Sequence, residues 1–177
     1  MKTVHAGEAY GPESIFQAIT DLHADRIGHG TLLLQTDMIA DPTIKDREQY
    51  VEELTQYIAD RRITIEICLT SHMQTNPRLK RLENHPFMGM REHRLSTTFC
   101  TDNRTVSNTT VSNEIELAVK HLGLTATELK GSVIYGFKRS FFPGTYLDKR
   151  QYVRRIIDYY EALQEEHEEL VGEVPTD

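Results

Sequence analysis

Residues 2–30, KTVHAGEAYGPESIFQAITDLHADRIGHG, form the stretch that decides the fold. Short runs typical of strands, Lys2–Ala6 and Ala24–Gly28, lie on either side of a predicted helix over Glu13–Leu22. Four apolar residues of that helix recur at the spacing of one helical face, namely Ile15, Phe16, Ile19 and Leu22. A strand, a helix and a second strand in this order are typical of a parallel βα unit.

The same alternation continues along the chain. Two further runs, Thr64–Cys68 and Leu95–Thr101, are predicted to be strands. Helical spacing of apolar residues predicts further helices over Asp46–Arg61, Ser112–Leu122, Thr125 towards Tyr135, and about Asp148 to Leu170. The chain is therefore expected to adopt an α/β fold with a parallel sheet.

Signals at helix ends support two of these helices. Gly123 follows Leu122 and supplies a C-terminal stop. Thr125 and Glu128 have the spacing of a capping box, which opens the next helix.

The longest irregular stretch is Ser71–Arg94, which contains Asn76-Pro77 and His85-Pro86. A residue before proline is biased away from the helical region, so we expect a loop with room for one turn of helix. Nothing in the spacing of its three histidines resembles a metal motif, and we expect surface or capping positions for His72, His85 and His93.

The chain has 177 residues, which is enough for one domain over residues 1–177 and leaves no room for a second. A complete eight-fold β/α barrel needs about 250 residues and rarely has fewer than about 200. A whole barrel of that kind therefore does not fit.

Composition excludes several classes of function. Twenty Lys and Arg against 27 Asp and Glu give a net charge of −7, which repels phosphate backbones and argues against nucleic-acid binding. No apolar stretch approaches the roughly 18 residues of a membrane span, so the protein is expected to be soluble and cytoplasmic. Its two cysteines, Cys68 and Cys100, are predicted to be buried reduced thiols, with a single intramolecular bridge as the alternative.

Reactive side chains follow three of the predicted strands. They belong to His5-Ala-Gly-Glu8, Gly28-His29-Gly30 and Thr101-Asp102-Asn103. The carboxyl ends of parallel strands meet at one edge of a sheet, so these groups are expected to converge. Histidine and carboxylate ligands suit zinc, and a neighbouring Glu/His pair can move protons, as in a metal hydrolase.

Each group also has a simpler interpretation. A single histidine such as His5 or His29 is more often a hydrogen-bonded structural residue, and Asp102-Asn103 suits a helix cap or an Asx-turn. Zinc needs three or more protein ligands, whereas His5 and Asp102 make only two. Either His29 is the third, or the other ligands come from residues outside this chain.

Five segments in order along the chain carry a family resemblance. They are His5–Glu8, Arg26–Gly30, Cys68–Ser71, Thr101-Asp102 and Phe141–Tyr146. Together they resemble the carboxyl-terminal half of the adenosine deaminase family, and the last segment looks like bacterial members. The resemblance implies the carboxyl-terminal half of a TIM-type (β/α)8 barrel, with about four βα units and a long C-terminal helix.

The resemblance also implies a reaction in purine metabolism. Members of the family are zinc-dependent hydrolases that convert adenosine or deoxyadenosine to the inosine product and ammonia. Zinc lowers the pKa of its water from about 15.7 to about 7, so hydroxide can attack the aromatic carbon.

The resemblance assigns roles to individual residues. His5 resembles a zinc ligand, and Asp102 resembles the carboxylate that ligates zinc and orients the hydroxide. Glu8 matches the acid that protonates the purine ring nitrogen, and His29 matches the group beside the metal-bound water. Gly7 matches a backbone donor near the ring.

The sequence departs from the family pattern at two points. Asn103 stands where the family frequently has a second acid, and its NH2 group can still hydrogen-bond a ring nitrogen. The family takes its other two zinc ligands from a His-x-His pair at the first barrel strand, and this sequence has no such pair.

We therefore expect a partial-barrel domain that begins inside a barrel and associates with a complementary amino-terminal half or with itself. Its expected edge strands are the one bearing His5 and a short one near Lys130–Ile134, and exposed edges favour pairing. One alternative is a catalytically silent truncated fragment or half-barrel oligomer. Another is a related adenine or nucleotide deaminase, which basic residues near a phosphate would favour; the candidates, otherwise a solvated face, are Lys138, Arg139, Lys149 and Arg150.

Overall fold

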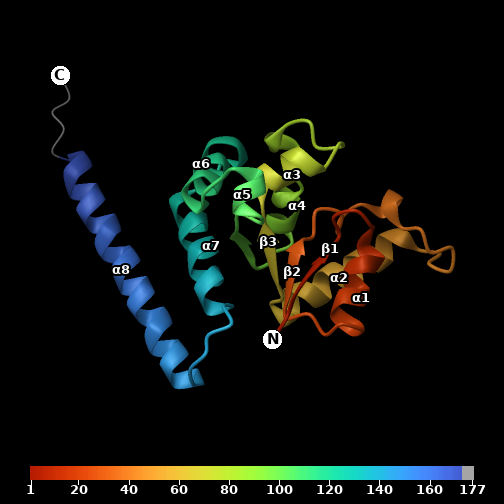
Figure 1. Ribbon diagram of the computed structural model, residues 1–177, viewed down its shortest axis with the longest axis horizontal. Helices are drawn as coiled ribbons and strands as arrows, with labels where there is room; N and C mark the ends of the chain where they lie inside the picture. The colour runs from red at the N-terminus through yellow and green to blue at the C-terminus, as the bar shows by residue number, and fades with distance from the viewer. Residues whose placement is uncertain (173–177) are drawn as a thin grey trace.

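A four-stranded parallel sheet forms the centre of the protein in the computed structural model, which describes residues 1–172 and side chains up to residue 167. The strands lie in the order of the chain (Figure 1): β1 Thr3–Ala6, β2 Arg26–His29, β3 Thr64–Ile67 and β4 Thr97–Phe99. All four predicted strands are confirmed, although each is shorter than expected or shifted by up to two residues.

The register gives the sheet one apolar face and one polar face. Val4 pairs with Ile27 and Ile27 pairs with Ile65, and these side chains contribute to the core. Successive side chains alternate between faces, so His5 and Glu66 lie on the opposite face. There the Arg26 guanidinium donates to Glu66 through Nε and Oε1, 2.6 Å apart.

Helices cover the apolar face. The first four α-helices are α1 Pro12–Thr20, α2 Arg47–Arg61, α3 Leu69–Thr75 and α4 Phe87–Glu92. Ile15 of α1, Ile58 of α2 and Met90 of α4 are fully buried with the strand residues in a single core cluster. Two short 3₁₀ segments, η1 Thr36–Met38 and η2 Leu82–Asn84, lie in the connections.

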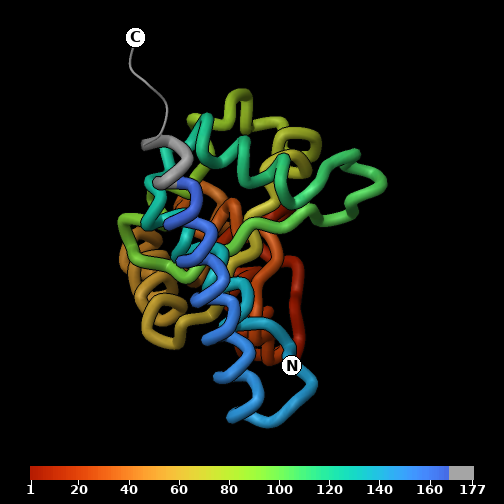
Figure 2. The backbone as a smooth tube through the Cα atoms, turned by 90° about the vertical axis from the view of Figure 1, so that its left-hand side faces the viewer, coloured from red at the N-terminus to blue at the C-terminus, as the bar shows by residue number. Residues whose placement is uncertain are grey.

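The second half of the chain is helical: α5 Arg104–Ser107, α6 Val111–Leu122, α7 Ala126–Lys138 and α8 Tyr146–Gly172. The predicted helix ends are confirmed, because Gly123 has a φ of +62° after α6 and Thr125 and Glu128 form the capping box of α7. Helix α8 packs along α7 (Figures 1 and 2). Within residues 1–172, no helix is both long and apolar enough to cross a membrane.

Two sequence-based expectations about secondary structure are wrong. The stretch Ser71–Arg94 contains α3, η2 and α4 instead of a loop, because Leu82, Phe87 and Met90 are each buried in segments too short for helical spacing to be visible. Residues 130–134 are not an edge strand but the middle of α7, whose start is fixed by the capping box. The second edge strand is β4, which α7 contacts.

The histidines of that stretch also differ from expectation. His72 and His85 are only 1% and 2% exposed, although both were expected at surface or capping positions. His85 does act as a cap, since the Phe87 N–H at the start of α4 donates to its Nδ1 over 3.1 Å. Burial lowers the pKa of His85 to about 4 and holds the pKa of His72 well below its usual value.

Both cysteines are free thiols, as predicted. Cys68 is buried and Cys100 is partly buried. Burial raises the pKa of Cys100 to about 11 and raises that of Cys68 further. Both groups are therefore thiols rather than thiolates near neutral pH.

Glu114 ties the second half of the chain to the first. It lies in the first turn of α6 with no exposed surface. Its carboxylate accepts from the Thr70 N–H at 3.2 Å, from the Thr70 hydroxyl, and from Thr109 Oγ1 at 2.8 Å. A buried carboxylate is stable only when such donors replace water, so this cluster fixes α6 against α3.

Replacing Glu114 by alanine removes the acceptor that three donors from Thr70 and Thr109 share. We expect Glu114→Ala to lower the free energy of unfolding by about 2–3 kcal/mol in urea titrations. The matched control is Glu116→Ala, at an exposed position of the same helix, which should change it by less than about 0.5 kcal/mol. Equal losses in the two variants would contradict the role of Glu114.

The buried His85 makes stability depend on pH. Its pKa is lower in the folded chain, so the unfolded chain binds more protons below about pH 6.5 and stability falls as the pH drops towards about 4. Between these limits the native chain should lose about 3 kcal/mol more than His85→Gln. Urea unfolding at several pH values measures the difference. His167→Gln, at an exposed position of α8, is the control and should follow the native profile.

Candidate metal and catalytic centre

Three strand ends bring His5, His29 and Asp102 together. One ligand atom of each residue lies within 4.8 Å of the others, so the expected convergence occurs. His29 and Asp102 have φ values of +70° and +54°, in the left-handed region, and both stand where the chain turns away from a strand. The donor set of imidazole and carboxylate groups is one that zinc binds.

Gly28 makes room for the His5 ring. The two residues are register partners on β1 and β2. A Cβ at position 28 would lie 2.7 Å from His5 Cδ2, which is too close for any side chain. With glycine there, the His5 and His29 rings meet edge to face, and His5 Nδ1 lies 3.2 Å from His29 Nε2.

Asp102 is held from the side by Ser71. The Ser71 hydroxyl donates to Asp102 Oδ2 over 2.8 Å. Ser71 itself is buried in α3, directly after β3, so the strand end positions this donor. The Cys68–Ser71 segment therefore contributes to the centre through its serine.

Glu8 lies beside the cluster, at the wall of a cavity. Its Oε2 is 3.5 Å from His29 Nε2, and its side chain is 34% exposed. The cavity has a volume of about 480 Å³, and its other lining residues are Ala9, Leu32, Met38, Thr75, Asn76, Pro77 and Arg78. Mixed apolar and polar walls next to reactive groups are typical of a ligand site.

Gly7 has a structural role that conflicts with the expected donor role. Its N–H donates to Ser14 Oγ at 2.8 Å, so it is not available to a ligand in this structure. Its carbonyl accepts from the Leu32 N–H at 2.7 Å and from Thr31 Oγ1 at 2.9 Å. With a φ of +64° and Ile15 Cδ1 2.5 Å from the place of a Cβ, the position requires glycine.

Asn103 serves as the N-cap of α5, which is the simpler interpretation considered for it. Its Oδ1 accepts from the Val106 N–H over 3.1 Å, and the residue is exposed. The cap uses the carbonyl oxygen and leaves the NH2 group as the part of this side chain that can donate to a ligand.

Sequence reasoning missed two histidines behind the centre. His29 Nδ1 lies 3.0 Å from His72 Nε2, and His72 Nδ1 lies 2.8 Å from His85 Nε2. The sequence signal for His72 is its place directly after Cys68–Ser71, a segment that carries the family resemblance. Burial lowers the pKa of His29 too, although the neighbouring Glu8 carboxylate acts in the opposite direction.

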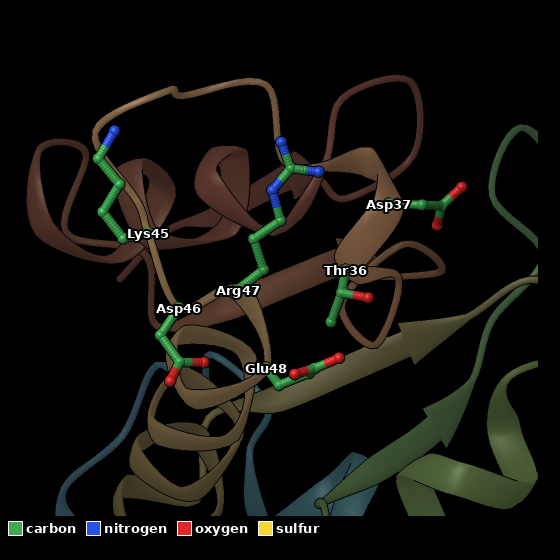
Figure 3. A pocket seen from close by; sticks show the side chains of 6 residues that line it. All are labelled: Thr36, Asp37, Lys45, Asp46, Arg47 and Glu48. Carbon is green, nitrogen blue, oxygen red and sulfur yellow. The ribbon is translucent and has the colours of Figure 1, made fainter.

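Two other cavities lie apart from this centre. One, of about 550 Å³, is lined by the six side chains in Figure 3, which come from residues 36–37 and 45–48. Another, of about 400 Å³, lies between α7 and α8 and is lined in part by Lys138, Arg139, Lys149 and Arg150. The turn between these helices lies on the same side of the molecule as the N-terminus (Figures 1 and 2). The strand ends that carry the centre lie on the opposite side.

Comparison with known proteins agrees with this geometry. The family model for adenosine deaminase matches residues 1–159. An adenosine deaminase from Mycobacterium avium (strain 104) is 36% identical over 142 residues, which are 80% of this chain and 38% of that protein. The chain thus spans less than two fifths of the length of this relative.

Solved structures match the same region. The structure of the ADAL–IMP complex is 30% identical with a TM-score of 0.64, over 89% of this chain and 40% of that one. An amidohydrolase from Burkholderia ambifaria with bound Zn matches in fold, with a TM-score of 0.69 at 24% identity over 91% and 41%. The four parallel strands and their helices are accordingly part of the TIM-barrel fold of these deaminases and amidohydrolases. The chain belongs to the adenosine deaminase family.

Proposed function

We propose that this chain provides one half of an active site that hydrolyses adenosine or deoxyadenosine to the inosine product and ammonia. The observation that carries the proposal is the convergence of His5, His29 and Asp102, with Glu8 only 3.5 Å from His29 at the wall of a cavity. If these strand ends had only a structural role, neither the cluster of three possible ligands nor the position of Glu8 beside a cavity would be expected.

His5 and Asp102 are the residues we assign as zinc ligands. Their donor atoms belong to one cluster, and Ser71 holds the Asp102 carboxylate in place. Bound zinc lowers the pKa of a water molecule to about 7, which supplies a nucleophile at neutral pH. Zinc needs at least three protein ligands, and we propose that a complementary amino-terminal half supplies a His-x-His pair.

Glu8 is the group we assign to proton transfer. Addition of a nucleophile to the carbon that bears the amine moves an electron pair onto the adjacent ring nitrogen, which then needs a proton. A carboxyl at the cavity wall can deliver that proton. His29 lies within reach of both Glu8 and His5. It can therefore fix the position of the attacking oxygen atom relative to the Glu8 carboxyl group.

The same cavity suits a purine. Leu32, Met38 and Pro77 provide apolar surface for the flat ring. Asn103 follows Asp102 in the chain and is not one of the residues that line this cavity, and its NH2 group is our candidate for a hydrogen bond to a ring nitrogen. Gly7 has no part in this proposal, because its N–H is already bonded to Ser14.

A nucleoside monophosphate is a second candidate substrate. Arg78 lines the cavity that contains Glu8, and arginine binds phosphate well. Its Nη1 lies 3.0 Å from Asp37 Oδ2, and a phosphate would have to compete with that carboxylate. The similarity to the protein in the structure of the ADAL–IMP complex supports this candidate.

Reconstitution tests the assigned roles. The chain is combined with an amino-terminal half of a relative, and bound zinc is measured by elemental analysis and turnover by ultraviolet absorbance. Glu8→Gln should keep zinc and lose turnover by about 100-fold or more, because the proton donor is gone. Asp102→Ala should lower both zinc content and turnover.

The control is Glu116→Gln, at an exposed position of α6, which should leave both quantities unchanged. Near-normal turnover in Glu8→Gln would contradict the proton-transfer role. A native reconstituted protein with neither zinc nor turnover would favour the catalytically silent alternative. A loss of AMP turnover alone in Arg78→Gln would favour the nucleotide.

The open sheet favours association. β1 is an edge strand whose polar side chains Thr3 and His5 are exposed, and unpaired strand edges tend to recruit a further strand. We expect the 20.4 kDa chain to elute as an oligomer in gel filtration at low micromolar concentration, or as a complex when an amino-terminal half is added. A well-folded monomer that does not bind this half would contradict the expectation.

A further inference from the structure

Four histidines form an unbroken series of hydrogen bonds from the backbone of α4 to β1. The Phe87 N–H donates to His85 Nδ1 over 3.1 Å. His85 Nε2 is then 2.8 Å from His72 Nδ1, and His72 Nε2 is 3.0 Å from His29 Nδ1. Finally, His29 Nε2 is 3.2 Å from His5 Nδ1.

The direction of this series follows from its first member. A backbone amide can only donate, so His85 Nδ1 must accept. A neutral imidazole has one donor and one acceptor nitrogen, so His85 Nε2 carries the proton and donates to His72. The same reasoning places a proton on His72 Nε2 and makes His29 Nδ1 an acceptor.

Each of these three rings accepts a hydrogen bond at one nitrogen, so the geometry itself requires each ring to be neutral. His29, His72 and His85 are each no more than 2% exposed. Burial lowers the pKa of all three groups, and neighbouring histidines lower that of His72 further.

We infer that His72 and His85 are positioning residues that keep the ring proton of His29 on Nε2, where it faces the candidate centre as a hydrogen-bond donor. Both nitrogens of His29 are then in use, because Nδ1 accepts from His72 and Nε2 donates. His29 is therefore not a third metal ligand, and in its neutral form it cannot accept a proton at Nε2. Its role in the reaction rests on the proposed deaminase function.

The acceptors on the far side fit this assignment. His29 Nε2 has His5 Nδ1 at 3.2 Å and Glu8 Oε2 at 3.5 Å, and both of these atoms can accept a hydrogen bond. The Nε2–H group of His29 can thus orient the Glu8 carboxyl group. It can also orient an oxygen atom of the nucleophile that lies between His29 and Glu8. Hydrogen bonds from His72 and His85 behind His29 fix the orientation of its ring as well as the position of its proton.

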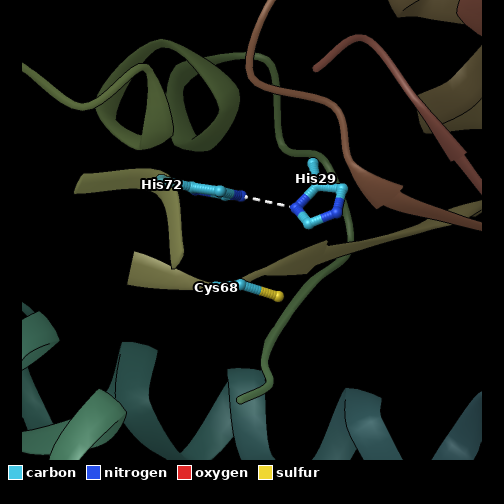
Figure 4. Close-up of side chains that lie close together, drawn as sticks. All are labelled: His29, Cys68 and His72. Carbon is cyan, nitrogen blue, oxygen red and sulfur yellow. Dashed lines mark hydrogen bonds between the residues drawn. The ribbon is translucent and has the colours of Figure 1, made fainter. Parts of the chain in front are cut away.

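A buried metal site is the competing interpretation. His29, Cys68 and His72 each offer a ligand atom within 4.8 Å of the others (Figure 4). The hydrogen bond between His29 and His72 already accounts for the approach of the two rings. Cys68 is a buried thiol that lies 3.8 Å from the Glu66 carbonyl oxygen, and its raised pKa opposes the thiolate that a metal needs.

Nuclear magnetic resonance of the full chain with ¹⁵N-labelled histidine tests the inference at neutral pH. We expect the Nε2–H form of His29, His72 and His85, with scalar couplings across the two N–H···N bonds that join them. A proton on His29 Nδ1, or the absence of both couplings, would overturn the inference.

Two variants of nearly equal shape test whether His72 sets the proton of His29. In His72→Gln the amide has an acceptor for His85 and a donor for His29, so His29 should remain in the Nε2–H form. In His72→Glu the carboxylate can only accept, so the proton of His29 should move to Nδ1. An unchanged His29 in a folded His72→Glu variant would mean that His72 has only a packing role.

Addition of one equivalent of Zn²⁺ tests the competing site. The coupling between His29 and His72 should persist. Its loss, if prevented by Cys68→Ser, would overturn the inference in favour of a buried metal site. None of these measurements depends on turnover, so a confirmed proton position together with an inactive reconstituted protein would contradict the deaminase proposal alone.

Discussion

Parallel pairing between β1 and β2 is the interaction on which the candidate centre depends. It places His5 beside Gly28, and the absence of a side chain at residue 28 lets the His5 ring lie against β2. The next residue, His29, turns away in the left-handed region and meets that ring edge to face. A shift of register by one residue would move His5 to the apolar face and separate the two imidazoles.

The demand that buried polar groups find partners organises the rest of the chain. Glu114 meets it with threonine donors, and Arg26 meets it with Glu66 on the polar face of the sheet. His72 and His85 satisfy this demand by a hydrogen bond to each other. Because Glu114 and Thr70 are 44 positions apart and Arg26 and Glu66 are 40 apart, polar pairing contributes to the specificity of the fold as well as to its stability.

The sequence predicts what depends on short-range signals. The four strands, the stop at Gly123 and the capping box at Thr125 each need only a few neighbouring residues, and all are confirmed. The convergence of His5, His29 and Asp102 was also predictable, because the ends of parallel strands meet at one edge.

The features that escaped prediction depend on long-range contacts. His72 and His85 are buried and stack on each other although 13 residues separate them, and the nearby helices α3 and α4 are too short to show a helical pattern. The Gly7 N–H donates to Ser14 Oγ, and no sequence signal marks Ser14 as its acceptor. Residues 130–134 pair with no strand because the capping box starts α7, which contains them. This local signal outweighs the expectation of an edge strand.

The backbone N–H that donates to His85 has a consequence for how this protein can vary. Its donor belongs to the main chain at Phe87, so every residue except proline would supply the same group at that position. Substitutions there would alter packing and leave the polarity of the histidine series intact. Comparison of homologous sequences would therefore reveal the histidines but not the group that orders them.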